Sequence, residues 1–151
     1  MPEHPATIEW KADSPGRFRD GSYSRAHILS FDGGAEVKAS ASPHNVPVPM
    51  ADPAGVDPEE MLVAATASCH MLWFLHVARD AGLDVSSYRD EAVGRLGNLD
   101  GRIGITRIVL RPRIAFEGDA PDAETLARLH HEAHERCFIA NSLKSEVVIE
   151  G

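Results

Sequence analysis

Two cysteines are the residues of this chain with the most distinctive chemistry, and they lie far apart in the sequence, at Cys69 and Cys137. A cysteine attacks a peroxide oxygen as its thiolate, whereas a free thiol with a pKa near ~8.5 is mostly protonated at neutral pH. Cys69 falls in the middle of an expected helix, beyond the first turn where the helix dipole acts, so an arginine is the natural group to stabilise a thiolate there. The residues alone leave two interpretations open: a redox pair, or two small apolar side chains packed in a reducing compartment.

A histidine-rich stretch, HHEAHERC, supplies a second set of candidate ligands. His130, His134 and Cys137 stand at i, i+4 and i+7 and lie close to one face of a helix, a spacing that can ligate zinc. Solvated or capping histidines are the alternative, because only three ligands lie together. His70 adjoins Cys69, but adjacent residues on a helix do not face each other, so we expect a core histidine there.

The segment that must position Cys69 is a long helix expected over residues 57–82. Asp57 is its N-cap, and Glu60 stands three residues on, where a capping-box carboxylate reaches back; Gly82 is the C-terminal stop. Residues 61–78 contain no Asp, Glu, Lys or Arg, so every face of the helix is largely apolar. We expect burial on all sides rather than a membrane span, because its hydroxyl and imidazole side chains would be costly in lipid.

The segments on either side of this helix are expected to form strands and one further helix. Before it, the pattern predicts an antiparallel meander over 8–12, 23–31 and 35–41, with an exposed loop over 13–22 and a long proline-rich loop over 42–56. After it, the pattern predicts strands over 86–96 and 103–116 joined at 98–101, a helix opening at Pro121-Asp122, a helical turn over 138–143 and a strand over 144–150. On the second helix, Leu126, Leu129, Ala133 and Cys137 recur at spacings of three and four, so they form one core-facing stripe.

Composition excludes several function classes. A chain of 151 residues with 43% hydrophobic content is enough for one domain, over residues 1–151. Its net charge of −8 argues against nucleic acid and membrane partners and favours a small neutral or weakly polar substrate. There is no Cys-x-x-Cys, no Gly-rich phosphate loop and no Gly-x-Ser-x-Gly elbow, so the usual motifs of a thioredoxin-like, phosphate-binding or hydrolase site are missing. The N-terminus lacks a basic segment followed by an apolar run, and two cysteines do not make a disulfide scaffold, so the expected location is cytoplasmic.

Two motifs carry a resemblance to a known family. The stretch DPEEMLVAATASC with the apolar run after it, and CFIANSLKSEVVIE near the C-terminus, resemble the OsmC/Ohr superfamily of osmotically inducible and organic hydroperoxide resistance proteins. The resemblance implies an α+β, OsmC-like fold of order β3-α-β2-α-β. It also implies a cofactor-free thiol peroxidase of organic or inorganic hydroperoxides, in which Cys69 is peroxidatic and Cys137 resolves the sulfenic acid as a disulfide. A dithiol or lipoyl-type reductant would then reopen that disulfide.

The resemblance further implies an arginine from the N-terminal meander and a glutamate ten residues before the first cysteine. Glu59 stands at that distance, and counting favours Arg25 for the arginine, with Arg17 and Arg19 left open. The chain departs from the family at Phe138, where proline usually follows the second cysteine, and in the 42–56 loop. These departures bear on the choice of substrate and reductant.

Helix geometry adds an expectation about assembly. Ten helical residues rise by roughly 15 Å, so Glu59 and Cys69 cannot meet on one helix. Two long helices packed antiparallel about a two-fold axis would bring Glu59 of one copy to Cys69 of the other and cover the apolar faces. We therefore expect an intertwined homodimer. Two alternative functions stay open: a non-catalytic redox sensor and a metal- or ligand-binding member of the same fold.

Overall fold

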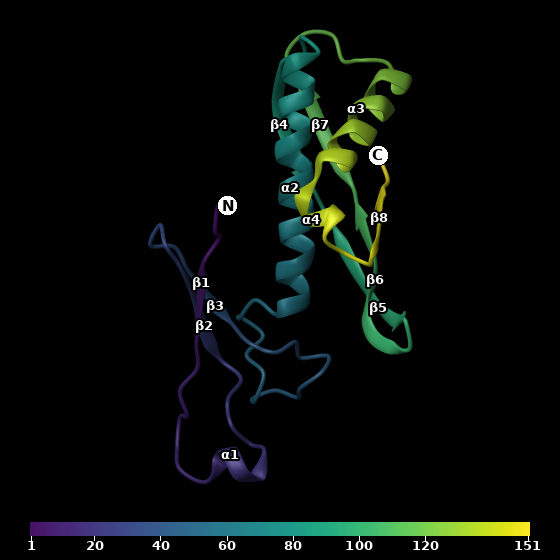
Figure 1. The fold of residues 1–151 in the computed structure, drawn as a ribbon. Helices are drawn as coiled ribbons and strands as arrows, with labels where there is room; N and C mark the ends of the chain where they lie inside the picture. Colours follow the sequence, from purple (N-terminus) through teal and green to yellow (C-terminus); the bar gives the residue numbers. More distant parts are fainter. The chain divides into compact units, whose positions relative to one another are not determined.

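The computed structural model describes residues 1–151, and the chain divides into two compact units, Met1–Met61 and Leu62–Gly151, here called the N-terminal and C-terminal units. Figure 1 labels the helices and strands of each unit along the chain. The expectation that residues 1–151 form one domain stays a prediction.

The N-terminal unit is built on a three-stranded antiparallel sheet. Its strands are β1 (Ala6–Glu9), β2 (His27–Phe31) and β3 (Glu36–Ala39), in the order β1-β2-β3. The turn between β2 and β3 closes with a hydrogen bond of 3.0 Å from the Gly34 N–H to the Phe31 carbonyl, and Gly34 has a φ of 89°, which glycine adopts without strain. The predicted meander and its turn are therefore confirmed.

The first strand and the loop after it differ from the prediction. β1 ends before Trp10, and the expected loop contains a short helix, α1 (Arg17–Asp20). The Trp10 indole N–H donates to the Ser24 carbonyl at 2.8 Å. The centroid of the indole lies 5.8 Å from that of the Phe18 ring and 5.6 Å from that of the Tyr23 ring. Alternation in sequence predicted a strand here, but these contacts between distant residues draw Trp10 out of it.

The proline-rich loop is ordered by one serine. Ser40 is fully buried; its hydroxyl accepts the Asp52 N–H at 2.9 Å, and its own N–H donates to Val56 at 3.1 Å. A Cβ on Gly55 would lie 2.9 Å from the Ser40 Cβ, so only glycine allows this approach. These bonds hold the loop against β3 ahead of the long helix.

The long helix, α2 (Pro58–Asp80), has the termini that the sequence predicts. The Glu60 N–H donates to Asp57 Oδ1 at 2.8 Å, and the Asp57 N–H donates to Glu60 Oε2 at 3.0 Å, so the capping box is present. After the helix, Gly82 has a φ of 80° and its N–H bonds the Arg79 carbonyl. Both helix-end predictions are confirmed.

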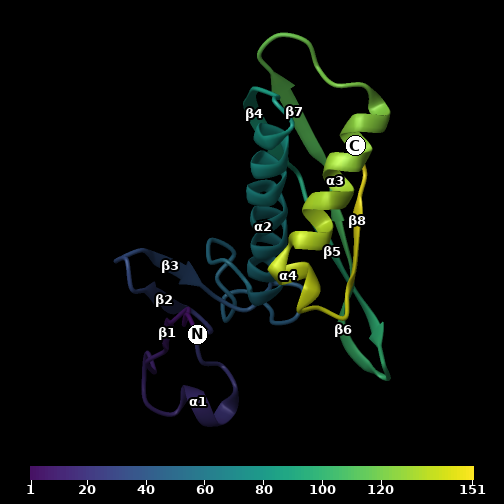
Figure 2. The same cartoon turned by 45° about the horizontal axis from the view of Figure 1, so that its top comes forward.

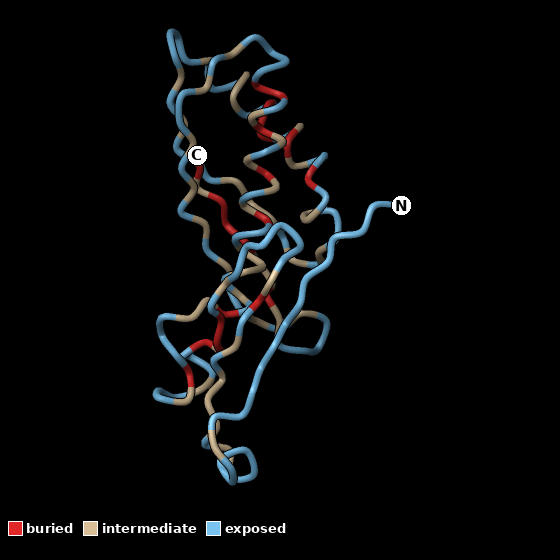
Figure 3. Tube along the Cα trace, turned by 90° about the vertical axis from the view of Figure 1, so that its left-hand side faces the viewer, coloured by how far each residue is buried: buried red, intermediate tan, exposed pale blue.

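Burial along α2 is one-sided within the single chain, which differs from the predicted burial on all sides. Figure 3 shows buried and exposed positions alternating along the trace. The buried residues are Thr66, His70, Phe74, Val77 and Ala78. Leu72 keeps 60% of its surface exposed. By length and composition α2 could cross a membrane, as core helices of soluble proteins also could. The faces of α2 away from these buried residues therefore keep exposed apolar surface.

The hairpin after α2 is longer and more broken than the sequence indicates. Each arm divides into two strands: β4 (Val85–Asp90), β5 (Val93–Leu99), β6 (Arg102–Leu110) and β7 (Pro112–Phe116). β5 pairs with β6, and β4 pairs with β7 in a separate sheet. Between β6 and β7 the backbone N–H of Arg111 donates to the Asp90 side chain at 2.7 Å instead of to a neighbouring strand. Pro112 has no N–H to donate to a neighbouring strand. The expected two uninterrupted arms are therefore corrected to four strands.

The C-terminal elements follow the prediction closely. α3 (Ala123–Arg136) begins with Asp122 as N-cap, α4 (Phe138–Asn141) follows it, and β8 (Glu146–Ile149) pairs parallel to β6. α2 and α3 lie over the strands of this unit in both Figure 1 and Figure 2. One buried cluster joins α2 to α3: Phe74, Val77, Ala78, Leu129 and Ala133. This cluster fixes the two segments that carry the cysteines.

Candidate functional site

The C-terminal unit brings the two cysteines together. Cys69 lies on α2 and is half-buried, whereas Cys137 lies between α3 and α4 and has 1% of its surface exposed. Both are free thiols, and the Cys69 thiol lies close enough to Cys137 to contribute to the raised pKa of the Cys137 thiol. Thiols this close can form a disulfide once one of them is oxidised.

The surroundings of Cys137 keep it protonated. Burial, and after it the neighbouring Cys69 thiol, raise the pKa of Cys137 to about 11. The Ala140 N–H donates to the Cys137 Sγ at 3.4 Å and works in the opposite direction, but it is outweighed. At neutral pH Cys137 is therefore a shielded thiol, which suits a residue that does not meet the oxidant first.

An aromatic pair adjoins the two cysteines. Trp73 lies one helical turn after Cys69 on α2, and Phe138 follows Cys137 directly. Their ring centroids are 5.6 Å apart with an interplanar angle of 80°, an edge-to-face contact. Phe138 stood out in the sequence as a departure from the family. Trp73 was not predicted as a site residue, although its spacing of four from Cys69 places it on the same face of α2.

Arg25 lies in the N-terminal unit, between α1 and β2. Its guanidinium donates to the carbonyl oxygens of Gly21, at 2.9 Å, and Tyr23, and it lies 3.5 Å from the centroid of the Tyr23 ring. No ion pair of the chain includes Arg25, whereas Arg17 lies 3.4 Å from Asp13. Arg25 is therefore held in a defined orientation by these carbonyl and ring contacts, and its charge has no carboxylate partner. Its approach to a cysteine stays a prediction.

Arg19, the third candidate arginine, lies exposed in α1 and has no ion-pair partner either. Unlike Arg25, it makes no side-chain hydrogen bond. Arg19 therefore carries a free charge without a fixed direction, and Arg17 carries a charge already paired with a carboxylate. Of the three, Arg25 has the best-defined geometry for binding a small anion.

Glu59 lies in the N-terminal unit, in the first turn of α2. Its Oε1 accepts from the Asn45 side chain at 3.5 Å, while its Oε2 is buried without a hydrogen-bond partner. An unpartnered buried carboxylate oxygen is costly, so a donor is expected to satisfy it. Asn45 belongs to the 42–56 loop, which therefore contributes to the surroundings of Glu59. The proximity of Glu59 to a cysteine also stays a prediction.

Two of the histidines, His70 and His130, form a buried pair. His70 and His130 are 1% and 7% exposed; their rings stack 5.4 Å apart, with 3.1 Å between His70 Nε2 and His130 Nδ1. Burial lowers the pKa of each to about 4, so both are neutral at pH 7. No three His, Cys, Asp or Glu residues are grouped as metal ligands. The core placement of His70 is confirmed, and its partner His130 was not foreseen.

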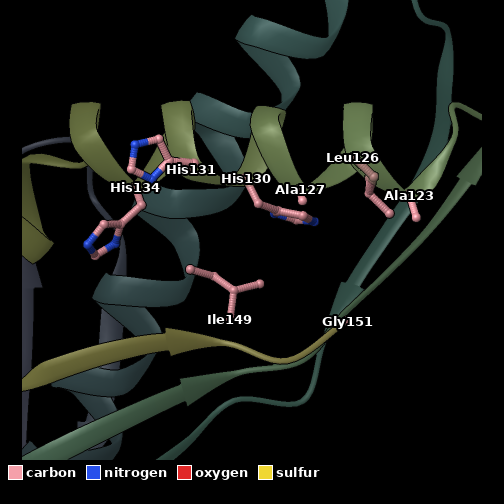
Figure 4. A pocket seen from close by; sticks show the side chains of 8 residues that line it. All are labelled: Ala123, Leu126, Ala127, His130, His131, His134, Ile149 and Gly151. Carbon is pink, nitrogen blue, oxygen red and sulfur yellow. The ribbon is translucent and has the colours of Figure 1, made fainter.

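A cavity of about 350 Å³ adjoins the histidine pair, between α3 and β8 (Figure 4). The cavity is lined by Ala123, Leu126, Ala127, His130, His131, His134, Ile149 and Gly151. Cys137 is not among the lining residues, so His130, His134 and Cys137 do not face one common space. The zinc-ligand interpretation of HHEAHERC has no support in this geometry.

A mixed α+β fold, with a half-buried cysteine on a long helix beside a second, shielded cysteine, defines a dithiol protein of the OsmC-like class. Residues 51–150 match the family described as OsmC-like protein, and the chain belongs to this family. The resemblance inferred from its two motifs is confirmed.

Two solved structures support the same fold. An OsmC-like protein of unknown function from Vibrio cholerae is 52% identical, with a TM-score of 0.95 and 99% of both chains covered. An organic hydroperoxide resistance protein from Elizabethkingia anophelis is 16% identical, with a TM-score of 0.70, covering 99% of this chain and 93% of the other. At 16% identity the second likeness shows the fold alone. The predicted OsmC-like α+β fold is therefore confirmed.

One relative has a name that describes an activity. The protein called peroxiredoxin OsmC from Escherichia coli (strain K12) is 29% identical over 96 residues. The match covers 64% of this chain and 66% of the relative, slightly less than two thirds of its length. The activity in that name is a statement about the E. coli protein and not about this chain.

Proposed function

We propose that this chain is a cysteine-based peroxidase that works through a Cys69–Cys137 disulfide. Its proposed substrates are organic hydroperoxides and, as a wider set, inorganic hydroperoxides. The observation that carries the proposal is the adjacency of two free thiols from distant parts of the sequence, one half-buried and one shielded. Membership of the OsmC-like family and the name of the E. coli relative support a peroxidase-like role at the level of the family.

The proposed catalytic cycle has three steps. The Cys69 thiolate attacks the terminal peroxide oxygen, the O–O bond breaks, and a proton completes the leaving alcohol; Cys69 becomes a sulfenic acid. Cys137 then attacks that sulfur, water leaves, and the S–S bond forms. A dithiol, of the lipoyl type in our proposal, exchanges with the disulfide, restores both thiols and becomes oxidised itself. No metal or organic cofactor enters any step.

The electrostatics of Cys137 fit this order of events. Burial is the main cause of its raised pKa, but the Cys69 thiol adds to it. A Cys137 thiol that stays protonated at neutral pH does not compete with Cys69 for the peroxide.

Arg25 is the proposed partner of the Cys69 thiolate. A guanidinium beside a thiolate favours its ionised form and can also hold a peroxide oxygen as charge develops on it. Glu59 is proposed to accept a hydrogen bond from the Arg25 guanidinium at its unpartnered Oε2. This bond would hold the guanidinium in place. Arg17 and Arg19 remain the alternatives for this role.

The proposed assembly is an intertwined homodimer. α2 carries no charged side chain over residues 61–78, and Leu72 lies on its exposed surface. A second copy packed antiparallel would bury this surface and bring Glu59 of one copy toward Cys69 of the other. Sedimentation that finds an active monomer would contradict this assembly. The need for a dithiol donor fits a reducing compartment such as the cytoplasm.

A stoichiometry experiment tests the proposed function against its alternatives. The reduced protein is mixed with excess alkyl hydroperoxide and a dithiol, and the peroxide consumed per protein is measured, with hydrogen peroxide as a second substrate. Many turnovers support the peroxidase. Consumption of one equivalent only would support a redox sensor, and binding without consumption would support a ligand-binding protein.

A further inference from the structure

Two of the contacts between α2, which carries Cys69, and the segment that carries Cys137 concern the cysteines and the residues beside them. One is the proximity of the two thiols. The other is the edge-to-face contact between Trp73 and Phe138, whose centroids are 5.6 Å apart. Because Trp73 follows Cys69 by one helical turn and Phe138 follows Cys137 directly, the two contacts lie side by side.

The residue before Cys137 contacts the same tryptophan. The Arg136 guanidinium lies 5.7 Å from the centroid of the Trp73 ring, within the range of a cation–π interaction. Arg136 is itself held by an ion pair of 2.6 Å with Glu132 one turn earlier on α3. Both sequence neighbours of Cys137 therefore hold one ring on α2.

Phe138 is largely exposed in the single chain and contacts the Trp73 ring. Its side chain keeps 69% of its surface exposed, so burial gives it little stabilisation. The first position of α4 needs no apolar residue for helix formation, and the N-cap bond of α4 comes from Cys137 instead. The defined interaction of this large ring is its edge contact with the indole.

We infer that Trp73 is a positioning residue, whose ring is held by Arg136 and Phe138 and keeps Cys137 within reach of Cys69. This inference rests on the proposed disulfide cycle. The sulfenic acid on Cys69 has two fates: capture by Cys137, which releases water, or attack on a second hydroperoxide, which gives a sulfinic acid and an alcohol. Holding the Cys137 segment against α2 favours capture, because the attacking sulfur is already in place.

The size of the effect follows from the kind of contact. Edge-to-face aromatic pairs and exposed cation–π contacts each correspond to about a two- to tenfold change in an equilibrium. Loss of one contact should therefore lower the peroxide concentration that over-oxidises Cys69 by about the same factor. The rate of the first oxidation of Cys69 should not change, since neither contact is part of that step.

The test compares variants of Phe138 in the full-length protein. Phe138→Ala removes the edge contact, and Phe138→Tyr keeps the ring. Ile103→Ala removes another largely exposed apolar side chain, one that does not contact Trp73. Each reduced protein is titrated with an alkyl hydroperoxide without reductant, and mass spectrometry measures disulfide and sulfinic acid. We expect the half-point of over-oxidation to fall about two- to tenfold in Phe138→Ala and to stay at the wild-type value in the other two.

Two results separate the inference from the proposed function. If the wild-type protein forms no Cys69–Cys137 disulfide, the proposed function fails and the inference fails with it. If the wild type forms the disulfide and Phe138→Ala resists over-oxidation equally well, only the inference fails. If Phe138→Ala does not fold, Arg136→Gln is compared with Arg136→Lys. Over-oxidation of Cys69 at a lower peroxide concentration in Arg136→Gln alone supports the inference. Over-oxidation at the same peroxide concentration in both variants overturns it.

Discussion

The Cys137 Sγ accepts the Ala140 N–H at 3.4 Å, so the shielded thiol is also the N-cap of α4. Two tasks therefore fall on one sulfur atom: it caps the helix that Phe138 opens, and it faces Cys69. A serine at this position keeps a capping oxygen, whereas an alanine does not. Serine is accordingly the substitution that removes the redox chemistry of Cys137 with the least structural change.

Cys137→Ser should keep the first oxidation of Cys69 but lose its protection. Without a resolving thiol, the sulfenic acid accumulates and is then oxidised to sulfinic acid under excess peroxide. Mass spectrometry of Cys69 checks this outcome. Cys137→Ala should behave in the same way and be less stable than Cys137→Ser by about 0.5–2 kcal/mol, measured by denaturant unfolding. Undiminished turnover of Cys137→Ser with a dithiol would remove Cys137 from the mechanism.

Cys69→Ser should abolish turnover while the protein stays folded. A serine hydroxyl is similar in size to a thiol, but it is not appreciably ionised near pH 7 and cannot form a disulfide. The measurement is peroxide consumption in the presence of a dithiol, with circular dichroism to confirm the fold. Full activity of this variant would contradict the peroxidase proposal.

Arg25→Ala should slow the reaction of Cys69 with peroxide, most strongly near neutral pH and less in alkali. Removal of a guanidinium makes formation of the thiolate harder, and high pH restores part of it. Stopped-flow rates over a pH series check this. Arg17→Ala and Arg19→Ala are the matched controls, and the same loss in either of them would show that a different arginine serves the site.

Acidification should destabilise the fold through His70 and His130. Burial lowers the pKa of each to about 4 in the folded state, below the usual value of 6.5, so the unfolded chain binds more protons between these values. Above about pH 6.5 these histidines therefore do not change the free energy of unfolding. As the pH drops from there toward about 4, each histidine lowers the free energy of unfolding by at most about 1.4 kcal/mol per pH unit. Urea unfolding over this pH range measures the slope.

His130→Gln should reduce that slope, whereas His131→Gln, an exposed neighbour on the same helix, should not. The comparison matters because burial also raises the pKa of Asp90, which stabilises the fold on acidification and partly opposes the histidines. Both variants keep Asp90, so their difference isolates the histidine contribution. Equal slopes in the two variants would show that the histidine pair is not neutral in the folded protein.

Asp57→Ala should destabilise the protein by about 0.5–2 kcal/mol, because the Glu60 N–H loses its capping oxygen. Thermal or urea unfolding measures the change. The control is Asp119→Ala, which removes an exposed aspartate that makes no ion pair or side-chain hydrogen bond, and it should leave stability within about 0.5 kcal/mol of wild type.

Local signals explain which parts of the fold were predictable from the sequence. The Asp57–Glu60 capping box, the turn at Gly34 and the apolar stripe ending at Cys137 each depend on residues within a few positions. The break at Asp90 and Arg111 depends on a bond between distant residues, and no local pattern encodes it. The same limit explains why α1 and the early end of β1 were missed.

The candidate site divides in the same way. Sequence motifs identified Cys69 and Cys137, and the structure places their thiols together. The contact of Trp73 with Phe138 was not predictable, because it joins two helices whose packing depends on the whole C-terminal unit. The roles of Arg25 and Glu59 rest on the family resemblance and stay predictions.

The central claim is that Cys69 and Cys137 form one redox couple, and its most direct test is mass spectrometry of the wild-type protein after one equivalent of an alkyl hydroperoxide. Non-reducing digestion should yield a peptide pair linked between Cys69 and Cys137, and a dithiol should separate it. A protein that consumes the peroxide but shows no such linkage would contradict the account, and Cys69 would then act alone.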